Sequence, residues 1–320
     1  MSKIYKTIDL FAGIGGIRMG FENTGHFETV FSNDYEEECK KTYDLNFDSS
    51  KLEIDDIRNI KSFELPQYDI LLAGFPCQPF SVAGYRQGFK DKKSRGDLFF
   101  QIIKILVDTQ PVGFLLENVK NLENHDKGNT FRTIKDSLKE IGYNIKFKIL
   151  NTKEYGDLPQ NRERIYIVGF KDKNILKNFK FPGPIKLTKS IRDLLQDENE
   201  IDGKYYYNKK PLYDRIKDDI VSFDTVYQWR RKYVRENKNN VCPTLTANMG
   251  TGGHNVPLIL DKKGIRKLTP RECARFQGFS DDYKLPEIAD SKLYKQFGNS
   301  VSIPVVKRVA EEMFSALKNF

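Results

Sequence analysis

Cys77 stands in a segment suited to presenting a reactive thiol. It lies within Gly74-Phe75-Pro76-Cys77-Gln78-Pro79-Phe80-Ser81, directly after the apolar run 68–73, which predicts a buried parallel strand. Open α/β sheets place ligands and chemistry at this end of a strand. Pro76 restricts one backbone angle and Gly74 permits a tight bend, so the sulfur can be directed into a crevice. An isolated cysteine is usually a structural thiol, but the surrounding turn residues favour a nucleophile.

Acidic and basic groups accompany two further predicted strands. Glu117-Asn118-Val119 ends a strand, and a carboxyl group beside a thiol in a dry crevice should have a raised pKa and donate a hydrogen bond. Gln160-Asn161-Arg162-Glu163-Arg164 precedes the last strand, and its guanidinium groups suit a carbonyl or a phosphate. Either arginine could instead be an ordinary edge-strand charge, and for Arg162 this alternative is nearly as strong.

A glycine turn, Asp9-Leu10-Phe11-Ala12-Gly13-Ile14-Gly15-Gly16, leaves the first predicted strand and opens a helix. Such a turn lets the backbone approach a ligand closely, but it lacks the third glycine of the dinucleotide fingerprint. We therefore expect some nucleoside cofactor. Asp34 ends the second strand, where a ribose diol would lie, and Tyr35 could stack on an adenine. Asp55-Asp56-Ile57 follows a further short strand, which precedes the run 68–73, and could bind the adenine amino edge, although each acid alone is more often a helix cap or a surface charge.

These residues require a sheet that brings strand ends together. The first half of the chain alternates apolar runs with helical spacing, which predicts a doubly wound α/β sheet covered by helices on both faces. The expected strands are 4–10, 27–31, 68–73, 112–117, 143–150 and 164–170, and the expected helices are 17–23, 35–45, 97–107 and 130–141.

The pattern breaks after residue 170. Pro182-Gly183-Pro184 interrupts the chain, and basic residues then alternate with aromatic ones, as in 227–233, which suits phosphate contacts and base stacking. Core aromatics under a solvated surface are the alternative, equally balanced for the tyrosines 205–207. Thr269-Pro270-Arg271-Glu272 predicts a capped helix, and 303–317 a last helix.

Composition narrows the classes of partner. The 320 residues carry a formal net charge of +9, which favours an anionic partner, nucleic acid before membrane surface. A run of about 18 apolar residues is absent, and the N-terminus does not read as a signal peptide. The four cysteines form no Cys-x-x-Cys pair, so we expect a reduced compartment and no metal.

Together the motifs resemble those of the DNA (cytosine-5) methyltransferases, of which the bacterial restriction-modification type is most similar. The resemblance runs from residue 4 to the C-terminus and spares only about 171–265, the region that differs between site specificities in that family. It rests on the Asp9 to Gly16 turn, the Gly74 to Gln78, Glu117 to Val119 and Gln160 to Arg164 segments, and also on Arg271-Glu272-Cys273-Ala274-Arg275 and Gln296-Phe297-Gly298-Asn299-Ser300-Val301.

The resemblance implies a class I S-adenosylmethionine-dependent methyltransferase fold, Rossmann-like, with a smaller inserted domain. The implied domains are catalytic and cofactor-binding (1–185), target recognition (186–267), and a hinge with the return of the chain (268–320). S-adenosylmethionine would be bound by Phe11, Ala12, Gly13, Gly15, Gly16, Asp34, Tyr35, Asp56, Ile57, Gly74, Pro76, Leu98, Asn299, Ser300 and Val301. Asp34 and Tyr35 depart mildly, since many relatives carry Glu and Trp there.

The implied substrate is duplex DNA with a short specific cytosine site. DNA contacts are expected from Gln78, Ser81, Arg95, Arg230, Arg231, Thr244, Thr246, Gly252, Gly253 and His254. Thr244-Leu245-Thr246 looks like the family's short Thr-Leu element. The recognised sequence cannot be read from these residues. We further expect a monomer in the prokaryotic cytoplasm, no membrane partner, and a separately encoded restriction endonuclease.

In the implied mechanism, the Cys77 thiolate adds to C6 of a flipped-out cytosine and makes C5 nucleophilic. Glu117 shares a proton with N3, and Arg164 holds Glu117 and the O2 carbonyl, with Arg162 in the same catalytic group. The base that removes the C5 proton is not identified, and water would suffice. The loop with the charged stretch 90–95 would close over the base.

Three other readings stay open. A zinc cytidine deaminase would act on the same base, but Phe80 stands where Pro-Cys-x-x-Cys requires a cysteine. An RNA methyltransferase of the same superfamily would use the same thiol chemistry with a smaller insert than 171–265. A DNA-binding regulator on an inactive scaffold would not need Cys77, Glu117 and Arg164 intact.

Overall fold

The computed structural model describes residues 3–76 and 98–318. Its contacts group into two compact units. Unit 1 comprises Met1–Leu150, Glu163–Gly183 and Val306–Phe320, and unit 2 comprises Asn151–Arg162 and Pro184–Val305. The three domains expected from the sequence stay a prediction. Cys77, Gln78, Ser81, Arg95 and the expected closing loop lie outside the described residues.

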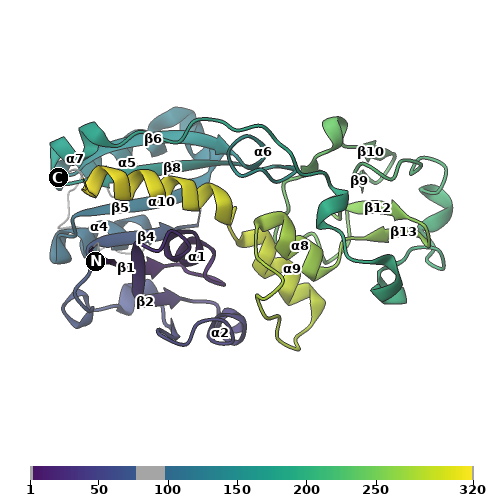
Figure 1. Cartoon of the computed structure of the whole chain (residues 1–320), viewed down its shortest axis with the longest axis horizontal. Coiled ribbons are helices and arrows are strands. Elements are labelled where there is room, and N and C mark those ends of the chain that lie inside the picture. The colour runs from purple at the N-terminus through teal and green to yellow at the C-terminus, as the bar shows by residue number, and fades with distance from the viewer. Residues whose placement is uncertain (1–2, 77–97, 319–320) are drawn as a thin grey trace. The chain divides into compact units, whose positions relative to one another are not determined.

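Unit 1 is built on a seven-stranded sheet in the order β3-β2-β1-β4-β5-β8-β6. The pairs among β3, β2, β1, β4 and β5 are parallel, whereas β8 runs antiparallel to β5. This is the doubly wound, mostly parallel sheet that the sequence predicts (Figure 1). The strands are β1 (Tyr5–Leu10), β2 (Phe27–Asp34), β3 (Leu52–Ile54), β4 (Ile70–Gly74), β5 (Gly113–Val119), β6 (Asn144–Asn151) and β8 (Glu163–Phe170).

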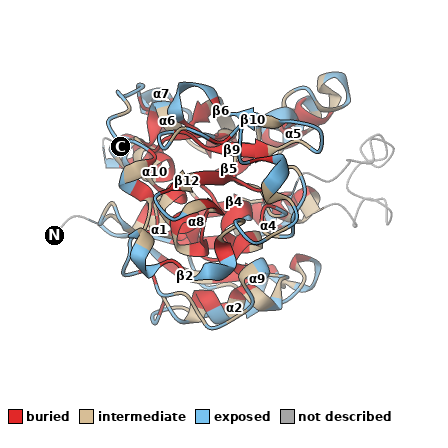
Figure 2. Cartoon of the chain, turned by 90° about the vertical axis from the view of Figure 1, so that its right-hand side faces the viewer, coloured by how far each residue is buried: buried red, intermediate tan, exposed pale blue. Residues whose placement is uncertain are grey.

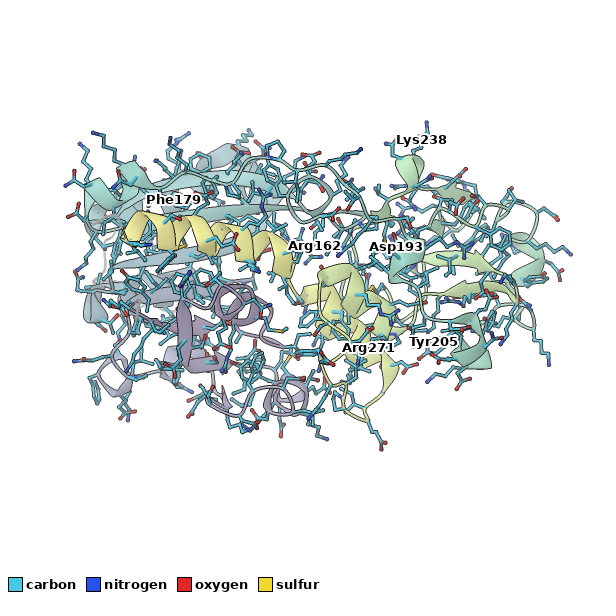
Figure 3. The ribbon with its side chains drawn as sticks, viewed as in Figure 1. Arg162, Phe179, Asp193, Tyr205, Lys238 and Arg271 are labelled. Carbon is cyan, nitrogen blue, oxygen red and sulfur yellow. The ribbon has the colours of Figure 1, made fainter. Side chains whose placement is uncertain are left out.

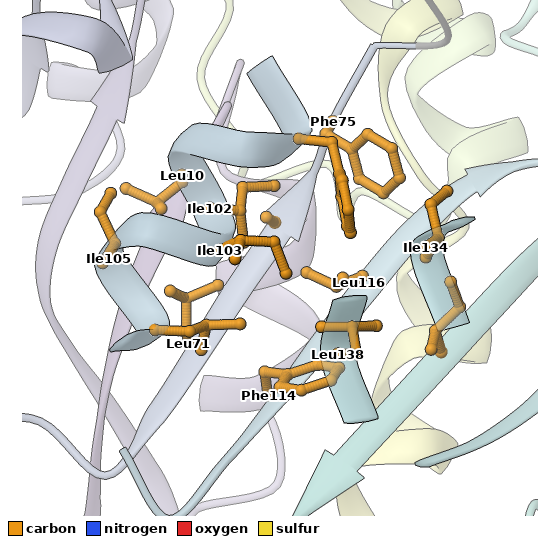
Figure 4. Packing of buried hydrophobic residues seen from close by; sticks show 14 of the residues in the cluster. Leu10, Leu71, Phe75, Ile102, Ile103, Ile105, Phe114, Leu116, Ile134 and Leu138 are labelled. Atoms are coloured by element: carbon orange, nitrogen blue, oxygen red, sulfur yellow. The ribbon is translucent and has the colours of Figure 1, made fainter. Parts of the chain in front are cut away.

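Helices cover both faces of this sheet. They are α1 (Gly16–Glu22), α2 (Glu37–Asp44), α4 (Leu98–Thr109), α5 (Asn129–Glu140), α7 (Lys173–Asn178) and α10 (Ile303–Lys318). One face packs on α4 and α5 through an apolar core that includes Leu71, Leu116 and Ile102 (Figure 4). On the other face α10 lies close to α1, because a Cβ added at Gly20 would come within 2.4 Å of Val306.

The buried central strands explain the apolar runs in the sequence. In β4, Ile70 to Ala73 are completely buried, as is expected for a parallel strand covered on both sides (Figure 2). Side chains alternate along β1, so Ile8 and Leu10 join the core with α4, whereas Asp9 points to the opposite face.

Unit 2 contains an antiparallel sheet in the order β10-β9-β12-β13 and a short parallel pair, β7 with β11. Ile216, Tyr227 and Leu258 belong to its core. Its strands are β7 (Gln160–Asn161), β9 (Tyr227–Trp229), β10 (Val234–Glu236), β11 (Cys242–Pro243), β12 (Leu258–Asp261) and β13 (Gly264–Lys267), and its helices are α6 (Thr152–Tyr155), α8 (Pro270–Gln277) and α9 (Asp290–Asn299).

Two features of unit 2 can be compared with the sequence. The capping box predicted at Thr269 is confirmed, because Thr269 accepts from the Glu272 backbone N–H and Glu272 accepts from that of Thr269. The sequence did not predict α9.

In the described part of the chain, no helix is both long enough and apolar enough to span a bilayer.

Candidate active site

The ends of β1 and β4 define the edge of the sheet where the predicted site residues of unit 1 begin. These strands pair in parallel with Leu10 opposite Ala73, and the strand order reverses between them. Open α/β sheets bind ligands at such a switch point. The glycine turn leaves β1 here, and Phe75-Pro76 leaves β4 here toward Cys77, which lies outside the described residues.

The glycine turn after β1 contains three residues in the left-handed backbone conformation. Phe11, Gly13 and Gly15 have φ values of 56°, 55° and 80°. A Cβ on Gly15 would collide with the Phe47 ring at 2.3 Å, whereas no atom lies within 4 Å of a Cβ added at Gly13. Gly15 is therefore required for packing, and Gly13 leaves space beside the backbone for a ligand. Gly16 begins α1.

Asp34 fixes this turn from the end of β2. Its Oδ2 accepts a 2.7 Å hydrogen bond from the Gly13 backbone N–H, and its Oδ1 accepts one of 2.7 Å from that of Glu36. Burial raises the pKa of the Asp34 carboxyl. The neighbouring Tyr35 is 70% exposed, so its ring is accessible for stacking. Ala12 is buried, and its N–H donates to the Asn33 carbonyl at 3.0 Å.

The end of β3 carries a further acid. Asp56 begins the 3-10 helix η1 (Ile57–Asn59) and accepts from the Arg58 backbone N–H at 2.9 Å. Hydrogen bonding from the Arg58 side chain lowers the pKa of Asp56. Ile57 is buried and Leu98 partly buried, and both pack in the core shared with α4. Asp56 is thus a helix cap that is also paired with Arg58 in this structure, and its side chain is 17% exposed.

Glu117 on β5, the strand beside β4, forms an ion pair with Arg164 on β8. Arg164 Nε lies 3.2 Å from Glu117 Oε1, and both side chains are largely buried, with 14% and 10% exposed. They come from paired antiparallel strands, with Val119 opposite Arg164. Glu117 lies opposite Gly74 of β4, and its Oε2 is 3.7 Å from where a Gly74 Cβ would stand. Glu163, which precedes Arg164, forms a separate ion pair in which Lys120 Nζ lies 2.9 Å from its Oε2.

Asn118 ties this carboxylate to the segment that leads to Cys77. The Asn118 side chain is 2% exposed, and its Nδ2 donates a 2.8 Å hydrogen bond to the Phe75 carbonyl. This role of Asn118 was not predicted from the sequence. A polar amide beside Glu117 in an otherwise apolar strand was the available signal, because a buried amide requires a partner.

Arg162 lies in unit 2 and is buried, with 2% of its surface exposed (Figure 3). Its Nη1 donates to the Leu245 carbonyl at 2.9 Å, and its Nη2 donates to the carbonyls of Gly298, at 3.3 Å, and Ser300. Ser300 and Val301 are buried, and Asn299 is exposed at the end of α9.

The residues predicted to contact DNA that the structure describes all lie in unit 2. Arg230 Nη1 donates to the His254 carbonyl at 3.3 Å. Gly252 and Gly253 have φ values of 90° and 81° with open space around them. Arg231 is exposed. Thr244 Oγ1 donates to the Asn161 carbonyl at 2.7 Å, and Thr246 Oγ1 donates to Asn248 at 2.8 Å.

The sheet edge of unit 1 fits a nucleoside ligand. The space beside Gly13, the buried acid Asp34 and the exposed Tyr35 ring supply room, an acceptor and a stacking face. Room, an acceptor and an aromatic face suit the ribose and adenine of a nucleoside. The residues present therefore agree with the cofactor that the resemblance implies.

Comparison with known proteins identifies the family. The model of the C-5 cytosine-specific DNA methylase family matches residues 5–315. The type II methyltransferase M.Bsp6I of Bacillus sp. (strain RFL6) is 56% identical over 310 residues, which cover 96% of this chain and 98% of that protein. M.NgoBI of Neisseria gonorrhoeae, also a type II methyltransferase, is 42% identical over 319 residues, 99% of this chain and 96% of that protein.

The solved structures agree on the fold. The S. pombe Dnmt2 methyltransferase matches with a TM-score of 0.74 at 19% identity, covering 99% of this chain and all of that chain. The Entamoeba histolytica methyltransferase EhMeth matches with a TM-score of 0.74 at 20% identity, covering 99% of each chain. The chain belongs to the C-5 cytosine-specific DNA methylase family, and its enzymatic class is DNA (cytosine-5-)-methyltransferase.

Proposed function

We propose that this enzyme methylates C5 of one cytosine within a short specific sequence of duplex DNA, as the modification enzyme of a restriction-modification system. The observation that carries the proposal is the Arg164–Glu117 ion pair at the end of β5, beside the strand that leads to Cys77. A carboxyl group held by a guanidinium can bind the N3 edge of a base, and the same guanidinium can bind its O2 carbonyl.

Cys77 is the proposed nucleophile. Its thiolate adds to C6 of the cytosine, which shifts electron density to C5. Glu117 offsets this change by placing a proton at N3. After C5 is alkylated, a base removes the C5 proton, and the thiolate leaves as the ring regains its double bond. Because both reacting carbons are inaccessible in a duplex, the target base must be flipped out at a cost of a few kcal/mol.

S-adenosylmethionine is the proposed cofactor, and when bound it supplies the methyl group. In unit 1 it would be held by Phe11, Ala12, Gly13, Gly15, Gly16, Asp34, Tyr35, Asp56, Ile57, Gly74, Pro76 and Leu98. In this proposal the Asp34 carboxylate accepts a hydrogen bond from the Gly13 backbone N–H. Its remaining lone pairs accept hydrogen bonds from the ribose hydroxyls.

The names of the relatives support the biological setting. M.Bsp6I and M.NgoBI are type II methyltransferases. We infer that this chain works beside a separately encoded restriction endonuclease, acts as a monomer and functions in the cytoplasm of a prokaryotic cell.

Sequencing of host DNA tests the proposal. The chain is expressed in a bacterium that lacks cytosine methylation, and the genome is read by bisulfite or nanopore sequencing. The expected result is 5-methylcytosine at one short recurring sequence, absent with the Cys77→Ala variant. No new modified base, or methylation on an exocyclic nitrogen, would contradict the proposal.

A further inference from the structure

Three segments that are distant in sequence meet at Arg162 within unit 2. The guanidinium donates to the carbonyls of Leu245, Gly298 and Ser300, and it is almost completely buried. Leu245 is the centre of Thr244-Leu245-Thr246, which the sequence predicts to contact DNA. Gly298 and Ser300 flank Asn299, which the sequence predicts to contact the cofactor.

The backbones of these two segments also touch directly. A Cβ built on Gly298 would lie 2.2 Å from the Thr246 carbonyl carbon and 2.4 Å from the Ala247 nitrogen. Real Cβ atoms do not approach backbone so closely, so no side chain fits at position 298 without separating the segments. Gly298 therefore permits the contact, and Arg162 bridges it.

The residues before Arg162 hold the same Thr-Leu element. Gln160 Oε1 accepts from the Leu245 backbone N–H at 3.1 Å, and Thr244 Oγ1 donates to the Asn161 carbonyl at 2.7 Å. β7 pairs with β11, which ends one residue before Thr244. Residues 160–162 thus fix the Thr-Leu element through both main chain and side chains.

We propose that Arg162 is a positioning residue that couples DNA binding to cofactor binding, and not a group that touches the reacting base. This inference rests on the proposed function. A buried guanidinium requires its acceptors, because removing one of them leaves a charge poorly satisfied. DNA that fixes the Leu245 carbonyl therefore also fixes the carbonyls on both sides of Asn299. Such coupling must be reciprocal between the two ligands.

Arg162→Lys is the test variant. Lysine keeps the charge but has no planar fork with which to hold two segments at once. Arg271→Lys is the matched control, because Arg271 donates to the carbonyls of Ser280 and Tyr283 in the same unit and contacts neither segment (Figure 3). Thermal unfolding of both variants shows whether they fold.

The measurement is the dissociation constant of S-adenosylhomocysteine, the demethylated cofactor that cannot transfer a methyl group, by titration calorimetry, with and without a duplex bearing the site found by sequencing. In the wild type and in Arg271→Lys, the duplex should tighten cofactor binding by about 5-fold or more. In Arg162→Lys the tightening should fall below about 2-fold, which is under that coupling range. Coupling kept in Arg162→Lys, or absent from the wild type, would overturn the inference.

A second variant keeps the test decisive if Arg162→Lys does not fold. Gly298→Ala separates the same two segments and should lower the coupling while Arg162 is intact. Unchanged coupling in a folded Gly298→Ala protein counts against the inference. Wild-type protein that binds no cofactor, or that modifies no DNA, would instead contradict the proposed function, so the two failures are distinguishable.

Discussion

Asn118 Nδ2 donates a hydrogen bond of 2.8 Å to the carbonyl oxygen of Phe75, two residues before the proposed nucleophile. The bond joins the end of β5 to the end of β4, and both residues are buried. It therefore holds the chain that enters the Pro-Cys segment against the strand that carries Glu117. Asn118 is a positioning residue for the thiol in this interpretation.

Replacing Asn118 by Ala should destabilise the enzyme and slow methyl transfer. The Phe75 carbonyl would lose its partner in a buried place, which costs about 1–3 kcal/mol. The free energy of unfolding, from urea denaturation, and the turnover number measure the two effects. Asn121→Ala is the control, because Asn121 is exposed on the following turn. An Asn118→Ala protein with wild-type stability would show that the bond contributes little.

Replacing Cys77 by Ala should abolish both methyl transfer and covalent trapping. Duplexes that carry 5-fluorocytosine cannot lose a proton from C5, so the adduct with the thiol accumulates and is seen as a band shift on a denaturing gel. Cys39→Ala is the control, because Cys39 is a buried thiol on α2. Trapping that persists in Cys77→Ala would remove this residue from the mechanism.

Replacing Glu117 by Gln should lower the turnover number by about 100-fold or more, as is typical when a proton donor is lost. The amide keeps the size of the carboxyl group but cannot place an acidic proton at N3. Duplex affinity should change little, because the Arg164 charge is kept. Filter binding and single-turnover methylation measure the two quantities.

Glu163→Gln is the matched control for Glu117→Gln. Glu163 is the adjacent acid on β8 and pairs with Lys120 at the surface. Its loss should leave turnover within about 2-fold, because its exposed carboxylate pairs with Lys120 and not with Arg164. Equal turnover in both variants would argue that Glu117 does not transfer a proton.

The fold of unit 1 could be predicted because most of its strands are short apolar runs that alternate with segments of helical spacing. The direction of β8 could not, since nothing in its own residues states whether it enters the sheet parallel or antiparallel. In unit 2, β12 and β13 were missed because Lys262-Lys263 joins them in place of a typical hairpin turn sequence. α9 was missed because its apolar positions are few, among them Leu293 and Phe297.

The candidate site could also be predicted only in part from the sequence. Glu117 and Arg164 could be placed at strand ends from the sequence, and the structure brings them within 3.2 Å. The surroundings of Arg162 could not be foreseen, because its acceptors lie more than 80 residues away, at Leu245 and beyond. Local spacing identifies a guanidinium but does not identify which carbonyls will surround it.

The buried carboxyl group of Asp9 should make the stability of the protein depend on pH. Asp9 follows Ile8 on β1, is completely buried, and neither of its carboxyl oxygens has a hydrogen-bond partner among the described residues. Burial raises the pKa of Asp9 from 3.8 to about 8. Between these values the folded protein keeps a proton that the unfolded chain has released. The free energy of unfolding therefore falls as pH rises through this window, by up to about 1.4 kcal/mol per pH unit.

Asp9→Asn removes this titration while keeping the shape of the side chain. Below about pH 4 the carboxyl of the wild type and the amide of the variant are both neutral in every state, so their difference in stability should be smallest there. As pH rises toward 8, the variant should become progressively more stable than the wild type. Urea denaturation at several pH values measures the difference, with the exposed Asp48→Asn as control. A difference that is constant with pH would mean that Asp9 ionises normally in the folded protein.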